Sequence, residues 1–137
     1  MDAKELKERT KQFALRVMEL VDALPNTISG RAIASQLVRS GTSVGANYRA
    51  ACRGRSKAEF AAKLGICIEE ADECEYWLEL IGDGGLLAKP KLSELAQEAH
   101  ELAAIFVASV RTTRDSSPQS IIKNRQWNCQ EQRHHAL

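Results

Sequence analysis

The sequence has few aromatic residues, few prolines and no long apolar run. Aromatic side chains make up 5% of its 137 residues and three residues are proline, whereas β-sheets are enriched in aromatic and β-branched side chains. Charged residues recur every few positions in residues 1–25, which excludes a signal peptide or a membrane span there. The abundant residues, among them alanine, leucine and glutamate, favour helices. The composition therefore predicts an all-α protein, and we expect it to be cytoplasmic and without membrane contact.

The cysteines lack the spacing of a metal site or of a disulfide framework. They are Cys52, Cys67, Cys74 and Cys129, and no two of them form a C-x-x-C pair. Cys67 and Cys74 share a helical face, but no histidine lies near them in the sequence to complete a metal site. We expect free thiols, with Cys67 and Cys74 in the core, and no metal or other cofactor.

Apolar residues recur at three- and four-residue steps in four segments, and each segment predicts an amphipathic helix. The helices are expected at residues 4–24, 29–53, 57–81 and 92–110. Ser56 and Glu59 match a capping box at the start of the third helix, and the glycine-rich residues 82–85 should end it. Because the connections are short, we expect an antiparallel up-down-up-down four-helix bundle.

The sequence predicts one domain followed by a disordered tail. Hydrophobic residues make up 44% of the chain, which is sufficient for a single core. We place that domain at residues 1–114. The apolar period breaks after Arg114, so residues 115–137 are expected to form a mostly disordered tail. Leu15 and Met18 lie beside the main apolar stripe of the first helix, and this second strip favours self-association.

The net charge of +1 conceals two segments of opposite sign. Residues 25–58 contain six basic residues and no acidic one, and residues 59–83 contain eight acidic residues and one basic residue. The six basic residues are Arg31, Arg39, Arg49, Arg53, Arg55 and Lys57. The first four form an arginine stripe, because they fall within an arc of about 80° on the expected second helix, nearly opposite its apolar stripe.

Two interpretations of the arginine stripe remain open. A row of guanidinium groups on a rigid helix suits the phosphates of RNA or DNA, since each group offers a planar fork of donors. Alternatively, the stripe is a solvated face or pairs with the acidic third helix. In an antiparallel hairpin turning near Arg55, Arg39 lies level with about Asp72 and Arg31 with about Glu79.

Two glycines and a polar seam mark the second helix as a contact surface. Gly41 and Gly45 lie in its interior, where each glycine costs about 1 kcal/mol relative to alanine, so they indicate the close approach of another helix. Ser43 and Asn47 are one turn apart beside the apolar stripe. Their side chains favour either a contact between subunits or a hydrogen bond within the chain.

No residue pattern predicts a catalytic site. Glu75 and Glu79 are one turn apart, which is weak support for an acid–base pair or metal ligands. The Glu-x-x-His pairs of di-metal bundles are missing. We therefore expect a protein that binds rather than catalyses.

Three segments together resemble a known family. They are Ser40-Gly41-Thr42-Ser43-Val44-Gly45-Ala46-Asn47-Tyr48, Ser56-x-x-Glu59-Phe60, and Glu69-Glu70-Ala71-Asp72-Glu73-x-x-Tyr76-Trp77-Leu78. Over residues 6–114 the chain resembles the four-helix-bundle proteins known as 23S ribosomal RNA intervening-sequence proteins. The resemblance implies a homopentameric ring encoded within inserts of ribosomal RNA genes. It also implies a relation to accessory proteins of diversity-generating reverse transcriptases, and it implies no enzymatic activity.

The leading hypothesis is a homo-oligomeric bundle that binds RNA or DNA through the basic residues of its second helix. The alternative is an interaction scaffold, or an accessory subunit of a protein such as a reverse transcriptase, that binds no nucleic acid. In the alternative, the same arginines hold subunits together or bind an acidic protein.

Overall fold

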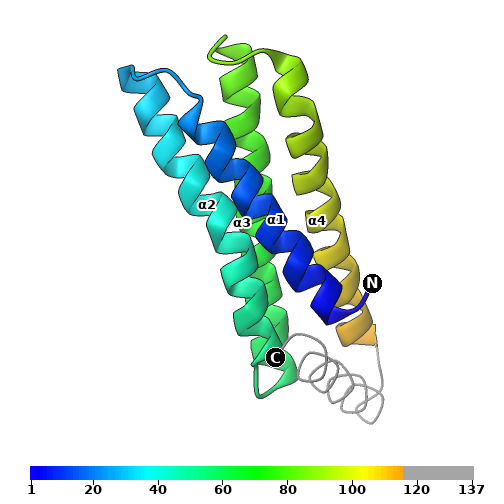
Figure 1. Ribbon diagram of the computed structural model, residues 1–137. Coiled ribbons are helices and arrows are strands. Elements are labelled where there is room, and N and C mark those ends of the chain that lie inside the picture. Colours follow the sequence, from blue (N-terminus) through cyan, green and yellow to red (C-terminus); the bar gives the residue numbers. More distant parts are fainter. Residues whose placement is uncertain (116–137) are drawn as a thin grey trace.

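The computed structural model describes residues 1–115, which form four α-helices and no strand. The helices are α1 (Ala3–Asp22), α2 (Ile28–Cys52), α3 (Lys57–Asp83) and α4 (Lys89–Asp115) (Figure 1). The predicted all-α class is confirmed for these residues. Of the tail expected at residues 115–137, Asp115 ends α4 and the remainder lies outside the described residues.

Side-chain caps fix the starts of the first three helices. The side chains of Asp2, Thr27 and Ser56 accept hydrogen bonds from backbone N–H groups three residues later, at 2.8, 3.1 and 3.0 Å. Such caps satisfy N–H groups that have no partner within the helix. At α3 the expected capping box forms with a shift of one residue. The Glu59 carboxylate accepts from the backbone N–H of Arg55 instead of that of Ser56.

Helices α3 and α4 extend beyond the predicted residues. Helix α3 continues through Gly82 to Asp83, because Gly84 keeps a right-handed backbone (φ −80°) and only Gly85 (φ +70°) is left-handed. Helix α4 begins at Lys89 and ends at Asp115, so it is longer at both ends than residues 92–110. Pro90 is compatible with this start, since backbone N–H groups in the first turn need no partner within the helix.

Helices α2 and α3 pack against each other and run in opposite directions. Cys67 on α3 donates to the carbonyl of Val44 on α2 at 3.5 Å, whereas Cys74, further along α3, donates to Ser40, earlier on α2, at 3.3 Å. Helix α3 packs extensively on both α2 and α4, whereas α1 packs mainly on α2 and only sparsely on α4. Helix α1 is therefore covered on fewer sides than α3.

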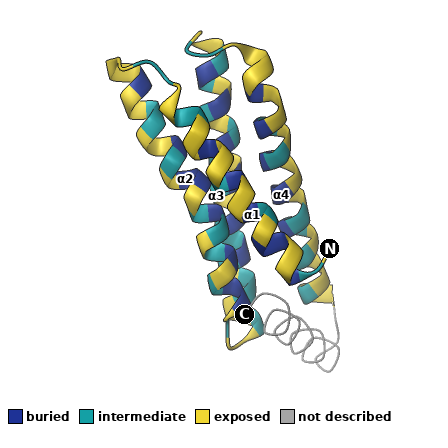
Figure 2. Ribbon diagram, viewed as in Figure 1, coloured by how far each residue is buried: buried dark blue, intermediate teal, exposed yellow. Residues whose placement is uncertain are grey.

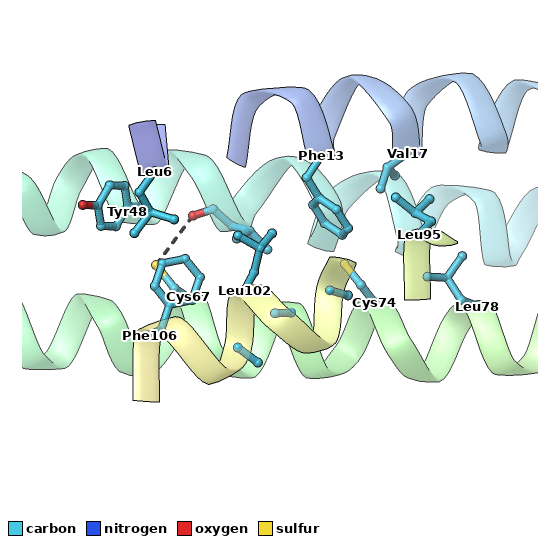
Figure 3. Packing of buried hydrophobic residues seen from close by; sticks show 14 of the residues in the cluster. Leu6, Phe13, Val17, Tyr48, Cys67, Cys74, Leu78, Leu95, Leu102 and Phe106 are labelled. Carbon is cyan, nitrogen blue, oxygen red and sulfur yellow. Dashed lines mark hydrogen bonds between the residues drawn. The ribbon is translucent and has the colours of Figure 1, made fainter. Parts of the chain in front are cut away.

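One apolar core runs along the centre of these helices (Figure 3). Phe13, Leu37, Leu64 and Phe106 are fully buried, and the rings of Tyr48 and Phe106 lie 5.7 Å apart. The predicted burial of Cys67 and Cys74 is confirmed, since both are fully buried. Burial raises the pKa of each of these two thiols to about 12. They are therefore unreactive core atoms at neutral pH.

The outward faces of the helices are exposed (Figure 2), and a few large apolar side chains lie on them. Leu15 and Met18 on α1 are each 45% exposed, and Tyr76 on α3 is 54% exposed. No helix within residues 1–115 is long and apolar enough to span a bilayer.

Candidate functional site

The predicted basic residues extend along α2 and around its connection to α3. Arg31, Arg39 and Arg49 lie on α2, Arg53 caps its C-terminal end, Arg55 lies in the connection, and Lys57 begins α3. All five arginines are exposed and Lys57 is half-buried. The structure divides these residues by what their side chains contact.

Arg39, in the middle of the stripe, is paired with α3. Its guanidinium donates to the carboxylate of Glu70 at 3.0 Å and also to Glu73. Glu73 additionally accepts from the indole N–H of Trp77 at 3.1 Å. The expected level of Asp72 was close, because Glu70 and Glu73 are its neighbours on the adjoining side of α3. The charge of Arg39 is therefore neutralised within the chain.

Arg31, at the start of α2, bonds to the preceding loop. Its guanidinium donates to the backbone carbonyl and side-chain oxygen of Asn26, at 3.3 and 3.1 Å. Within residues 1–115 it forms no ion pair with Glu79, the acid expected at its level. Its interaction is therefore local, with a loop residue five positions earlier in the sequence.

The remaining four cations gather where α2 ends and α3 begins. We refer to Arg49, Arg53, Arg55 and Lys57 as the basic end of α2. Among residues 1–115, none of their side chains has a carboxylate partner. The C-terminal end of a helix carries partial negative charge, which favours cations such as Arg49 and Arg53 there. The basic end therefore has positive charge available to a ligand.

Gly41 and Gly45 contact α1 of the same chain. A Cβ added at Gly41 would lie 2.7 Å from Val17 Cγ1, and one at Gly45 would lie 3.1 Å from Thr10 Oγ1. The close neighbour expected for these glycines is thus an intrachain helix. Both glycines lie on the edge of α2 that faces α1.

Ser43 and Asn47 bond to each other. The amide of Asn47 donates to the backbone carbonyl of Ser43 at 2.9 Å and to its hydroxyl at 2.8 Å. Both residues are half-buried. The bonds stay within α2, which matches the intrachain alternative, and they leave the amide oxygen of Asn47 for other contacts.

The structure adds Lys7, which no sequence motif marks as a functional residue. Lys7 lies on α1 and is only 5% exposed. Burial lowers the pKa of its ammonium, the Cys52 thiol opposes this, and Arg49 and Arg53 lower the pKa further. Its signal in the sequence is its position three residues before Thr10, on the same side of α1 as Thr10 and Val17.

Among residues 1–115, Glu75 and Glu79 do not converge with further metal ligands. Glu75 Oε1 lies 3.2 Å from His100 Nδ1 on α4, whereas Glu79 is exposed. In the described part of the chain, no three His, Cys, Asp or Glu side chains lie close enough to hold a metal ion. The polar contacts of Glu75 thus tie α3 to α4.

Comparisons with known proteins agree with this architecture. The family model of the 23S rRNA-intervening sequence protein matches residues 4–108. The chain is also similar to the crystal structure of a Bacteroides thetaiotaomicron protein of unknown function from the S23 ribosomal protein family, with 32% identity and a TM-score of 0.72. That match covers 77% of this chain and 97% of the other. No match is found among curated proteins.

Proposed function

Because the chain belongs to the 23S rRNA-intervening sequence protein family, we propose that it is a non-enzymatic protein that binds RNA through the basic end of α2. The observation that carries this proposal is the concentration of Arg49, Arg53, Arg55 and Lys57 without carboxylate partners among residues 1–115. Cations placed near a polyanion displace its condensed counterions, which gives affinity without sequence preference.

The proposed interface is smaller than the arginine stripe. Arg39 contributes little, because Glu70 and Glu73 already neutralise it. Arg31 is about six helical turns from Arg53 and bonds to Asn26 instead. RNA binding should therefore depend on one end of α2.

The proposal includes an assembly. We expect an up-down-up-down bundle that forms a homopentameric ring, in which the basic end is repeated around the axis. Repetition strengthens a weak single site, because each contact after the first is intramolecular. The exposed Leu15 and Met18 support a subunit contact on α1. Light scattering of Leu15→Glu/Met18→Glu tests this part, since a ring built on α1 would dissociate.

A second candidate function is a scaffold or accessory subunit that binds protein and no nucleic acid. The outer face of α3 favours it, because Glu69, Asp72 and Glu79 are exposed there beside the half-exposed ring of Tyr76. An acidic face with an exposed aromatic suits a basic partner protein. This candidate predicts that the chain shows no affinity for RNA.

A pair of double variants separates the two functions. Arg49→Gln/Arg53→Gln and the control Arg31→Gln/Arg39→Gln remove the same charge from the same helix. We expect the first to weaken binding of a short single-stranded RNA by about tenfold or more, and to reduce the slope of log affinity against log salt by about 1.4. The control should change the affinity by less than about threefold, since its charges lie beyond a Debye length of the basic end or are already paired.

The readout is a gel-shift titration over a series of salt concentrations. Equal affinities of wild type and both variants would show that the basic end does not bind the RNA. Absence of binding by the wild type, together with an intact oligomer, would favour the scaffold. Loss of the oligomer in Arg49→Gln/Arg53→Gln would assign these arginines to the subunit contact.

A further inference from the structure

Lys7 lies beside the basic end because of the way α1 meets α2. Gly41 lies against Val17 and Gly45 lies against Thr10, so each step forward along α2 is matched by a step back along α1. Arg49 and Arg53 continue the row of Gly41 and Gly45 at the same four-residue spacing. From the contact of Gly45 with Thr10, moving one helical turn along each helix places Lys7 near the level of Arg49, and both Arg49 and Arg53 are close enough to lower the pKa of Lys7.

The ammonium of Lys7 forms no hydrogen bond and no ion pair with another group among residues 1–115. Lys7 as a whole is only 5% exposed. A buried ammonium without a partner is unfavourable, and two guanidinium groups nearby add repulsion. Such an arrangement is stabilised when an anion binds between the cations.

Carboxylates nearest in the sequence or the fold are already engaged. Asp2 accepts from the backbone N–H of Glu5, and Glu8 accepts from Gln12. Glu59 accepts from the backbone N–H of Arg55. On the other side of α1, Glu98 is held by Arg9 at 2.6 and 2.7 Å. None of these acids forms an ion pair with Lys7.

We propose that Lys7, Arg49 and Arg53 form a binding site for a single phosphate group. Two planar guanidinium forks and one ammonium offer more donors than one carboxylate can accept, whereas a phosphate group has several acceptor oxygens. The inference rests on the proposed function for the source of the phosphate, which is the RNA backbone. Free inorganic phosphate offers the same chemistry.

The first test compares Lys7→Met with Lys91→Met in the full chain. Methionine keeps the length and the apolar stem of lysine but removes the charge, and Lys91 is an exposed lysine near the start of α4, at the opposite end of the bundle (Figure 1). We expect Lys7→Met to weaken binding of a short single-stranded RNA by about tenfold and to reduce the salt slope by about 0.7. Lys91→Met should change neither quantity.

The second test observes Lys7 itself in the wild-type chain. With lysine labelled at Cε, carbon NMR follows its pKa, and the resonance is identified by its absence in Lys7→Met. A bound phosphate favours the charged form, so adding the RNA should raise the pKa of Lys7. The groups facing Lys7 from α2 are Cys52, Arg49 and Arg53, and the comparison with and without RNA holds their direct effects constant.

The outcomes separate this inference from the proposed function. If RNA binding falls in Arg49→Gln/Arg53→Gln but is unchanged in Lys7→Met, and RNA leaves the pKa of Lys7 unaltered, the phosphate site is wrong while the proposed function stands. If the wild type binds no RNA but inorganic phosphate raises the pKa of Lys7, the phosphate site stands and the proposed function is wrong. A pKa that responds to neither probe overturns the site.

Discussion

A row of residues at four-residue spacing on α2 contacts α1 in two different ways along its length. In the first half, Gly41 and Gly45 let the backbone of α2 approach Val17 and Thr10 closely. In the second half, the row continues at the same spacing with Arg49 and Arg53, and the residue facing them is the buried Lys7. The row thus changes from close packing on α1 to a concentration of positive charge as it turns from the buried Gly41 to the exposed Arg49 and Arg53.

The difference between these halves indicates how a strained arrangement is tolerated. Close packing at Gly41 and Gly45 gains dispersion contacts and fixes the distance between α1 and α2. Because the helices are rigid, that distance carries over to the next turn, where Lys7 is largely buried close to Arg49 and Arg53. The first half therefore contributes stability, whereas the second half holds uncompensated charge, as expected of a binding site.

The largest effect on stability should follow from adding a side chain at Gly41, in the first half of the row. In Gly41→Ala the new Cβ would lie 2.7 and 2.9 Å from the two γ-carbons of Val17, which is fully buried and β-branched. We expect the free energy of unfolding to fall by about 1–3 kcal/mol, although alanine favours helices by about 1 kcal/mol over glycine. Urea denaturation followed by circular dichroism measures it.

Two further glycines calibrate that measurement. Gly65 on α3 has no atom within 4 Å of an added Cβ, so Gly65→Ala should stabilise the protein by about 0.5–1 kcal/mol. Gly45→Ala should fall between these values, because Thr10 Oγ1 is 3.1 Å from the new Cβ and is part of a stiff side chain. If Gly41→Ala were as stabilising as Gly65→Ala, the close approach of α1 and α2 would not exist in solution.

The sequence predicts the features that depend on local periodicity. The start of α3 follows from the Ser56 cap, and the packing of Gly41 follows from the cost of glycine inside a helix. The level of Arg39 on α3 also follows, to within two residues, because a short connection fixes the register of an antiparallel hairpin.

Features that depend on the fold could not be predicted in the same way. A lysine on a helix is normally solvated, so its burial becomes visible only when α1 is placed on α2 at Lys7. Which arginines pair with a carboxylate and which do not depends on the fold as well. Whether Arg39 or Arg49 reaches a carboxylate depends on how each turn of α2 faces α1 or α3, and composition contains no such information.

A smaller effect is expected in the pH dependence of stability. The folded chain lowers the pKa of Lys7 below its ordinary value of 10.5, so the unfolded chain binds this proton more tightly. The free energy of unfolding should therefore rise as the pH increases from the folded pKa of Lys7 towards 10.5. Below that window the penalty of the buried charge is fully present.

Urea titrations at several alkaline pH values test this dependence. Lys7→Met should lack the rise and should be more stable than wild type at neutral pH, whereas Lys91→Met should keep the rise. Other thiols and phenols titrate in the same range, so the informative quantity is the difference between the two variants. Identical pH profiles would mean that Lys7 is solvated, and the contrast between the two halves of the row would then disappear.

The smallest effect should come from Arg39, which carries the same charge as Arg49 in a different setting. Its side chain is 49% exposed, so its pairing with Glu70 is screened by water and salt. A double-mutant cycle with Arg39→Ala and Glu70→Ala should give a coupling free energy of roughly 0.2–1 kcal/mol that decreases with salt. RNA affinity should be nearly unchanged in Arg39→Ala, because its charge is already neutralised. If Arg39→Ala instead weakened RNA binding as much as Arg49→Ala, the ion pair would open when RNA binds, and the interface would extend along the whole arginine stripe.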